Sequence, residues 1–338
     1  MDRVSRSAVR LLVMLVTLGA PIARAQTGYQ ITSRIAVPGE GSLAALTADE
    51  STGLLYLSRG SAVEVIDTAT GQAVGRITET PGVRDVAIDS WLHRGFTSNH
   101  EDSSVTIFDS GTLETVQRVE TGNRPTSILL DPMTNRAFAI GEEIVAIDAR
   151  TGKVLRTIAL KSVPGAAGRN RLGHLFVTLP EKGSVAVVET NNLEVRQEFK
   201  VPKCTSPHAV AVDAANSRLF VGCANSRLVV LDAESGKRIT SLSICKNLTA
   251  MVFDPGEDLL INSCNEGALS FVQENSPYKF SPSGTVKMPG PVLAMDFDQK
   301  SKKIFVATRD VDSAKASDQE SKEHPAGQGS LAILVVSR

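Results

Sequence analysis

The chain has 338 residues, of which 42% are hydrophobic and 22% are charged, and its formal net charge is −1. This length admits one large β-rich domain or two ordinary domains. Proteins that bind nucleic acid carry clustered Lys and Arg that contact the phosphate backbone. The slightly negative net charge and the absence of a basic run in this sequence therefore argue against nucleic acid as a partner.

Residues 1–25 have the layout of a secretory signal peptide. Three arginines precede the apolar run 11–20, and a small-residue cleavage sequence ends at Ala25. A run of ten residues is too short to span the roughly 30 Å of bilayer hydrocarbon. We therefore expect cleavage after Ala25, a mature chain of residues 26–338 without a membrane span, and a periplasmic or secreted location. The leader carries four arginines and one aspartate, so its removal changes the net charge from −1 to −4.

A unit of about 41 residues repeats along the rest of the chain, and two series of polar residues mark it. One series ends the first apolar run of each unit: Asp49, Asp89, Asp131, Asp213, Asp254 and Asp298. The other ends the third run: Asp67, Asp109, Asp148, Glu189, Asp232 and Gln273. Two series that keep one period indicate a structural repeat.

Each unit contains four short apolar runs that predict strands. In one unit they are 208–212, 218–223, 227–231 and 237–243, and they lack helical spacing. Turns such as "DAESG" join the third and fourth runs, where Asp bonds its own backbone and Gly allows positive φ. Four antiparallel strands in about 41 residues predict one blade of a β-propeller.

Seven units begin near residues 43, 83, 126, 166, 208, 248 and 292, and the fourth is the least regular. The seventh ends at 331–337, which is its third strand, while residues 29–39 resemble a fourth strand with no unit before them. We expect this N-terminal strand to complete the last blade and so remove both open edges. The polar insertion 309–330 of the last blade predicts a surface loop, with a lid over the channel as the alternative.

The segments 218–237 and 136–155, with the ending 329–338, resemble the YVTN-type seven-bladed β-propeller repeat family of exported bacterial proteins. The resemblance extends over residues 26–338 and implies an all-β, single-domain propeller of four-stranded antiparallel blades. It implies no particular activity, because one fold supports many functions.

The four cysteines occur in two units at identical offsets. Cys204 and Cys245 lie nine residues before their unit's Asp, and Cys223 and Cys264 lie ten residues after it. Antiparallel pairing of the first two strands would bring each pair together, which favours the disulfides Cys204–Cys223 and Cys245–Cys264 in an oxidising compartment. A metal site or a reactive thiol is the alternative, but the spacing is not that of a zinc site.

The loops before the first strands and between the second and third strands are expected at one mouth of the central channel. Their candidate ligand-binding residues are Arg84, Asn99, His100, Arg124, Arg169, Asn170, Arg171, His208 and Arg309. Arginines in such a ring favour an anion or carboxylate site, although any single one could instead bond loop carbonyls and water. His100 with Glu101 and Asp102 could form a metal or acid–base group, but a solvated acidic loop is the simpler interpretation.

No hydrolase, metalloprotease, phosphate-loop or haem-attachment motif is present, and Trp91 is the single tryptophan. We expect no cofactor, no metal and a monomer. The favoured hypothesis is a non-catalytic binding or scaffold propeller that recognises a protein, glycan or small anionic ligand. The alternative is a lactonase-like hydrolase or lyase, with His208 as base and arginines as stabilisers. Nucleic-acid binding is a distant third.

Overall fold

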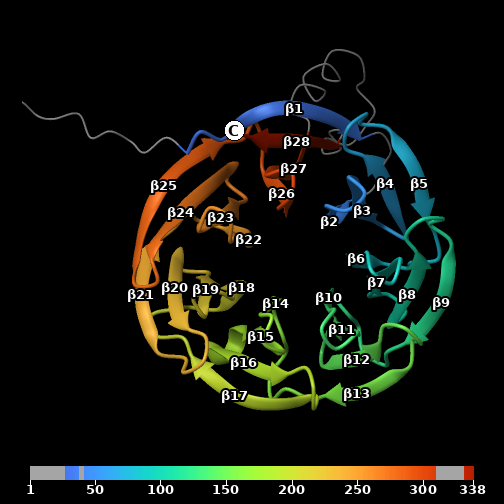
Figure 1. The fold of residues 1–338 in the computed structure, drawn as a ribbon, viewed down its shortest axis with the longest axis horizontal. Helices are drawn as coiled ribbons and strands as arrows, with labels where there is room; N and C mark the ends of the chain where they lie inside the picture. The colour runs from blue at the N-terminus through green and yellow to red at the C-terminus, as the bar shows by residue number, and fades with distance from the viewer. Residues whose placement is uncertain (1–26, 38–41, 310–330) are drawn as a thin grey trace, which may run out of the picture.

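The structure is a computed structural model that describes residues 27–37, 42–309 and 331–338. The expected leader 1–25 and residues 310–330 of the expected insertion lie outside these ranges. The described residues form seven four-stranded antiparallel sheets, arranged as blades around a central axis (Figure 1). The predicted fold class is confirmed: the chain is a seven-bladed β-propeller.

The first strand of each blade lines the axis. These strands are β2 (Leu43–Asp49), β6 (Val83–Asp89), β10 (Ser127–Asp131), β14 (Ala167–Arg169), β18 (Pro207–Asp213), β22 (Leu248–Asp254) and β26 (Val292–Asp298). The second strands are β3 (Leu54–Arg59), β7 (Arg94–Asn99), β11 (Arg136–Ile140), β15 (His174–Leu179), β19 (Arg218–Cys223), β23 (Leu259–Cys264) and β27 (Lys303–Arg309).

The third strands are β4 (Ala62–Asp67), β8 (Ser104–Asp109), β12 (Ile144–Asp148), β16 (Ser184–Glu189), β20 (Arg227–Asp232), β24 (Ala268–Ser276) and β28 (Leu331–Ser337). The strands on the rim are β5 (Ala73–Ile77), β9 (Thr115–Glu120), β13 (Val154–Ile158), β17 (Glu194–Lys200), β21 (Arg238–Ser243), β25 (Lys279–Lys287) and β1 (Gln30–Val37). One turn of 3-10 helix, η1 (Pro180–Lys182), joins β15 to β16. No helix of the described ranges is long and apolar enough to cross a membrane.

The N-terminal strand closes the ring. β1 pairs antiparallel with β28, from Gln30 opposite Ser337 to Val37 opposite Leu331. Ile35 and Val37 are buried against blade one, in a cluster that joins the last blade to the first. The last blade thus has three strands from one end of the chain and one from the other, as the unit count predicted.

A polar residue ends each innermost strand or, in blade four, directly follows it, and we call these seven the ladder residues: Asp49, Asp89, Asp131, Asn170, Asp213, Asp254 and Asp298. The Oδ1 atom of each accepts the backbone N–H two residues on, at 2.9 to 3.1 Å. This is the Asx turn that Asp and Asn favour. In the irregular fourth blade the ladder residue is therefore Asn170, which the sequence analysis took for a ligand candidate.

The hydrophobic core lies between the blades. Most buried hydrophobic residues of the described chain fall into seven clusters, and each cluster joins two neighbouring blades. Large aromatic rings occupy the middle of the second strand, seven residues after the ladder Asp: Tyr56, Phe96, Phe138, Phe220 and Phe305. Each of them is at most 1% exposed, so adjacent blades are held by burial of rings that each cover roughly 150–250 Å².

The two ends of the blades form two faces of the disc. The ladder face carries the turns after the ladder residues and the turns between the third and fourth strands. The disulfide face carries the loops that enter the innermost strands and those between the second and third strands, and it holds both disulfides.

Candidate functional site

The residues expected at one channel mouth lie on two faces. The disulfide face carries Arg84, Asn99, His100, Arg124, His208 and Arg309. Arg169, Asn170 and Arg171 lie on the ladder face, because β14 ends at Arg169 and these residues lead into the turn that follows it. The structure therefore does not bring the expected arginine ring together.

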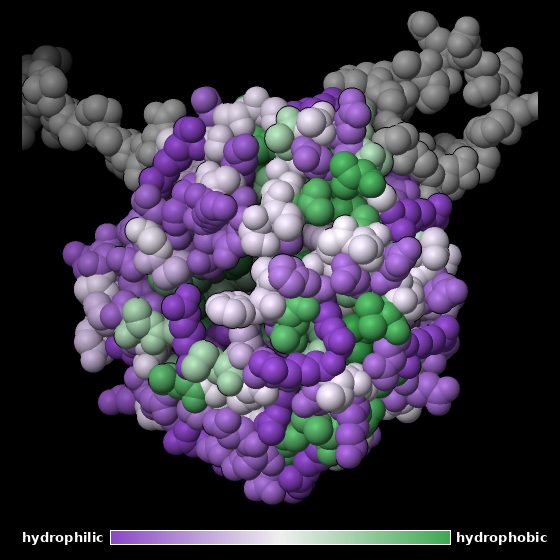
Figure 2. All heavy atoms as spheres, turned by 45° about the vertical axis from the view of Figure 1, so that its right-hand side comes forward, coloured by the Kyte–Doolittle hydropathy of each residue, from purple (hydrophilic) through white to green (hydrophobic). Residues whose placement is uncertain are grey.

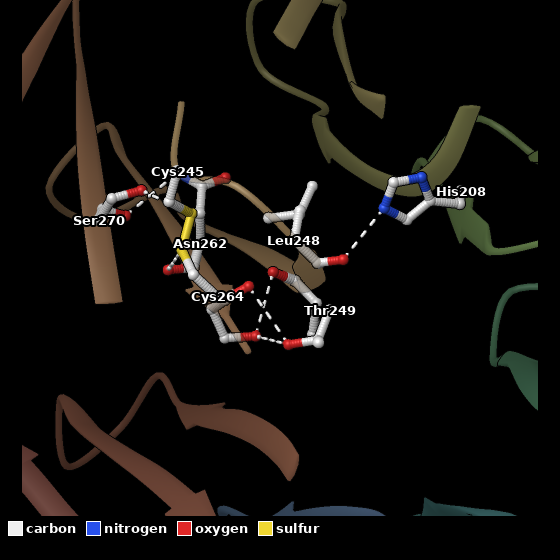
Figure 3. Close-up of a disulfide and its surroundings, with 9 residues drawn as sticks. His208, Cys245, Leu248, Thr249, Asn262, Cys264 and Ser270 are labelled. Atoms are coloured by element: carbon white, nitrogen blue, oxygen red, sulfur yellow. Dashed lines mark hydrogen bonds between the residues drawn. A yellow bond between two sulfur atoms is a disulfide. The ribbon is translucent and has the colours of Figure 1, made fainter. Parts of the chain in front are cut away.

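His208 joins two blades. Its Nδ1 atom lies 3.0 Å from the carbonyl oxygen of Ser206, and its Nε2 atom lies 3.0 Å from that of Leu248 in the next blade (Figure 3). A neutral imidazole donates to one of these oxygens and a protonated ring donates to both. A general base must reach the proton that it removes, and both ring nitrogens of His208 are directed at backbone carbonyls. This geometry gives His208 a structural role between two blades.

The two disulfides strengthen the same face. Cys204–Cys223 joins Cα atoms 5.3 Å apart, and Cys245–Cys264 joins Cα atoms 6.0 Å apart. Each links the loop that enters an innermost strand to the end of the second strand, which is the pairing that the offsets predict. Figure 3 shows the second disulfide beside Thr249, whose hydroxyl lies 2.8 Å from that of Ser263. Covalent and polar contacts thus hold the loops of blades five and six together.

Side chains of the acidic loop near His100 also bond other residues of the protein. Asp102 pairs with Arg118 and accepts a 2.7 Å hydrogen bond from Ser104. Asn99 is buried and donates to Ser104 and Thr106 at 3.0 and 2.8 Å. In the described part of the chain, no group of three or more His, Cys, Asp or Glu is placed to hold a metal ion.

Arg84 and Arg124 are exposed on the disulfide face, and their side chains make no hydrogen bond or ion pair with any described residue. They belong to neighbouring blades, and neither is among the residues that line the channel cavity described next. They remain predicted ligand-binding residues that lie apart from the channel cavity.

A cavity of about 460 Å³ occupies the channel towards the ladder face. The innermost strands β2, β6, β10 and β26 supply most of its wall, and Arg169 of β14 completes it. Glu50, Ser90 and Gln299, which lie in turns of the ladder face, line it as well, so the cavity reaches that face. Its volume is in the range of small-molecule sites, roughly 300–1,000 Å³.

Arg169 is the one cationic residue among those that line this cavity. Its side chain makes no hydrogen bond or ion pair with any described residue, although the charge of Asp131 acts on it. Burial lowers the pKa of the guanidinium and Asp131 opposes this effect, yet an arginine stays charged in proteins. A partly buried guanidinium with free donors is a strong site for a carboxylate or phosphate.

Two carboxyl groups line the same cavity from blades two and seven, the two neighbours of blade one. Asp85 accepts N–H bonds from Val86 and from Ile128 of the next blade, at 2.9 and 3.0 Å. Asp296 accepts them from Phe297 and from Ala48 of the next blade, both at 2.8 Å.

Burial raises the pKa of Asp85 to about 7, with a further increase from the charge of Asp296. Burial raises the pKa of Asp296 to about 6, and the charges of Asp298 and Glu50 add to it. In both cases burial outweighs the hydrogen bonds that favour the charged form. Near neutral pH these groups are therefore partly protonated, so they can donate a hydrogen bond as well as accept one.

The sequence analysis missed Asp85 and Asp296 as cavity residues. Both interrupt an apolar run away from the ladder position, in "VRDVAID" (83–89) and "VLAMDFD" (292–298). A carboxylate inside a strand that must line the channel is the signal that would have found them.

No protein-family model and no curated protein matches the chain. Solved structures do match by fold. The chain is similar to Kuenenia stuttgartiensis hydrazine synthase, with a TM-score of 0.69 and 13% identity over 79% of this chain and 92% of that one.

It is also similar to U3-55K, with a TM-score of 0.74 and 8% identity over 90% of this chain and 98% of that one. For the WD40 repeats of RRP9 the TM-score is 0.75, with 8% identity over 93% of this chain and 99% of that one. Identities this low show a shared propeller fold and nothing about ligand or activity.

Proposed function

We propose that the chain is an exported, non-catalytic binding propeller of the YVTN type, whose site is the cavity of the ladder face and whose ligand carries an anionic group. The proposal rests chiefly on Arg169, a cation without a hydrogen-bonded partner in the described chain, in a cavity of about 460 Å³. Export is supported by the two disulfides, since such bonds persist in oxidising compartments.

The other cavity walls narrow the ligand class. Asp85 and Asp296 would contact the part of the ligand that Arg169 does not bind. Hydroxyl groups on the ligand suit these carboxyl groups, because a partly protonated carboxyl both donates and accepts hydrogen bonds. Leu46, Val86 and Ile128, whose side chains are buried between the blades, also border the same space. The chemistry favours a small hydroxy acid or an acidic sugar, free or at the end of a glycan.

Calorimetry on the oxidised mature protein tests this proposal, with glucuronate, gluconate, citrate and inorganic phosphate as ligands and glucose as the uncharged comparison. At least one of the anions is expected to bind while glucose does not. Arg169→Gln should weaken that binding by roughly tenfold or more, because a hydrogen bond to a charged group contributes about 1.5–3 kcal/mol. Arg84→Gln, on the opposite face, is the matched control. Binding that survives Arg169→Gln but fails in Arg84→Gln would place the site on the disulfide face and refute the proposal.

A further inference from the structure

Three large hydrophobic side chains stand out from the ladder face at one position of the repeat. Trp91, Met133 and Leu172 each lie two residues after the ladder residue of blades two, three and four. Their exposed fractions are 90%, 72% and 61%. Among the exposed large hydrophobic residues of the described chain, Tyr278 at 75% is the other one above 60%, and its ring packs against the guanidinium of Arg218.

The turn fixes the direction of these side chains. The backbone N–H groups of Trp91, Met133 and Leu172 bond their ladder residues at 3.0, 3.1 and 2.9 Å, so the side chains are left on the outside. The turn itself needs no hydrophobic residue, because the other four blades carry small or charged residues at this position: Ser51, Ala215, Gly256 and Lys300.

The three residues belong to consecutive blades and so form one arc beside the cavity, which we call the apolar arc. Single exposed hydrophobic residues are normal, but neighbouring ones on one face mark an interaction surface. Figure 2 shows a surface that is hydrophilic over most of its area, with hydrophobic residues in separate groups and a hollow near the middle of the view. Trp, Met and Arg are also the residue types enriched where proteins meet.

The charges around the apolar arc indicate what it binds. Arg171 is exposed beside Leu172, and Arg169 lies at the same end of the blade, facing the cavity; neither side chain bonds a described residue. The carboxylate of Asp131 nearby is buried and accepts the N–H of its own turn. Across the cavity, in blade one, Glu50 is exposed. A partner's carboxylate is therefore attracted to the blade-four end of the arc and repelled from blade one.

We infer that the apolar arc is a docking surface for a peptide segment of another protein. Hydrophobic side chains of the peptide pack against Trp91, Met133 and Leu172, and an acidic group of the peptide binds the arginines of blade four. The inference rests on the proposed function, since Arg169 is the anion site of both. A small ligand would lie inside the cavity, whereas an arc that extends over three blades outside it needs an extended chain.

A phage-displayed library of random 12-residue peptides tests the inference without a known partner. The library is selected on the oxidised mature protein and, in parallel, on the triple variant Trp91→Ser, Met133→Ser, Leu172→Ser. Serine is suitable because Ser51 occupies the same turn position in blade one. We expect enriched peptides to combine Leu, Phe, Trp or Met with Asp or Glu, and the synthetic peptides to bind the triple variant at least tenfold more weakly.

A second triple variant controls for the loss of exposed hydrophobic area. Val74→Ser, Val116→Ser, Val163→Ser removes side chains that are 52%, 52% and 53% exposed away from the arc, and it should leave peptide binding unchanged. Thermal unfolding of both variants should match that of the parent protein within a few degrees. Selection of peptides without acidic residues, or of peptides that bind both triple variants equally, would overturn the inference.

Two further outcomes would assign the arc to another occupant and so contradict the inference. One is self-association of the parent protein that the first triple variant abolishes, measured by analytical ultracentrifugation. The other is arc-dependent binding to phosphatidylglycerol vesicles without any peptide selection. Calorimetry with the small anions separates the two proposals. If no small anion binds but acidic peptides still need the apolar arc, the proposed function fails and the docking surface stands with Arg171 as its cation. If an anion binds at Arg169 but no peptide needs the arc, the docking surface alone fails.

Discussion

The carboxylate of Asp85 accepts a hydrogen bond from the backbone N–H of Ile128, 3.0 Å away on the innermost strand of the next blade. Asp296 makes the corresponding contact with Ala48 at 2.8 Å, across the junction between the last blade and the first. The channel wall is therefore linked from blade to blade by carboxyl groups that also line the cavity. Protonation of these groups affects both the stability of the ring and the charge of the site.

We expect the stability advantage of the parent protein over Asp85→Asn to shrink as pH rises from 4 to 8. The folded pKa of Asp85 is raised to about 7, whereas an unfolded Asp has a pKa of about 3.9. Between these values the folded state binds more protons than the unfolded state, so stability falls as pH increases. Melting temperatures measured at several pH values provide the test. Asp67→Asn is the control, because turn hydrogen bonds lower the pKa of Asp67 and its contribution is lost as pH falls. A difference between parent and Asp85→Asn that is constant with pH would contradict the assignment.

Anion binding at Arg169 should weaken over the same pH range. Deprotonation of Asp85 and Asp296, with pKa values near 7 and 6, adds negative charge to the cavity wall. Calorimetric titration at pH 5.5 and 8 with an anion whose own charge is constant should show tighter binding at the lower pH. The double variant Asp85→Asn, Asp296→Asn should reduce that difference; an unchanged pH dependence would mean that these carboxyls do not face the ligand.

His208→Ala should destabilise the fold and leave ligand binding on the ladder face intact. The substitution removes the contacts to the carbonyls of Ser206 and Leu248, and a single imidazole N–H hydrogen bond contributes about 0.5–1.5 kcal/mol. Arg84→Ala is the matched control, because Arg84 has the same offset from its ladder residue but is exposed and bonds no described residue. Urea denaturation measures both variants. Equal stability of the two would refute the structural role of His208.

Loss of either disulfide should cost stability without changing the fold. Each bridge separates its cysteines by 19 residues, and the chain-entropy account gives about 3 kcal/mol for a loop of this length. The paired variants Cys204→Ser, Cys223→Ser and Cys245→Ser, Cys264→Ser should each lower the urea midpoint while the β-sheet circular dichroism is retained. Non-reducing peptide maps should recover the two within-blade links from the parent protein, and cross-blade links would disprove the pairing.

Most of the fold follows from the repeat in the sequence, because each blade must bury the same pattern of short strands. The closing strand was predictable for the same reason, since the last unit lacks a fourth strand and residues 30–37 have no other partner. The fourth blade was harder: its ladder residue is Asn170, whose Oδ1 accepts N–H bonds from Leu172 and His174 at 2.9 and 3.0 Å. An Asn does this as well as an Asp, but a search for Asp alone passes over it.

The candidate site was predicted less well, because it depends on which end of a blade a residue occupies. With Asn170 assigned to the ladder, Arg169 moves from the disulfide face to the ladder face. His208 illustrates a second limit: its position was predictable from the repeat, but its two carbonyl contacts depend on how neighbouring blades approach one another. The elevated pKa values of Asp85 and Asp296 likewise arise from burial that only the assembled ring provides.

Deletion of residues 26–37 should prevent formation of a stable monomer, whereas a chain that begins at residue 26 should fold. The deletion leaves the edge of β28 unpaired and removes Ile35 and Val37 from the cluster between the last and first blades. Exposed edges of this kind promote association. Size-exclusion chromatography with circular dichroism measures the outcome, and a monomeric, fully folded deletion variant would contradict the closing role of β1.

The pairing of Gln30 with Ser337 also sets the order of events during biosynthesis. A ribosome makes β1 before the other strands of the described chain and β28 after them, so β1 has no partner until β28 has been made. Contacts between residues so distant in sequence form slowly, because a very large loop must close before they yield any stability. The blades made earlier consequently form an open ring until β28 has been made and pairs with β1.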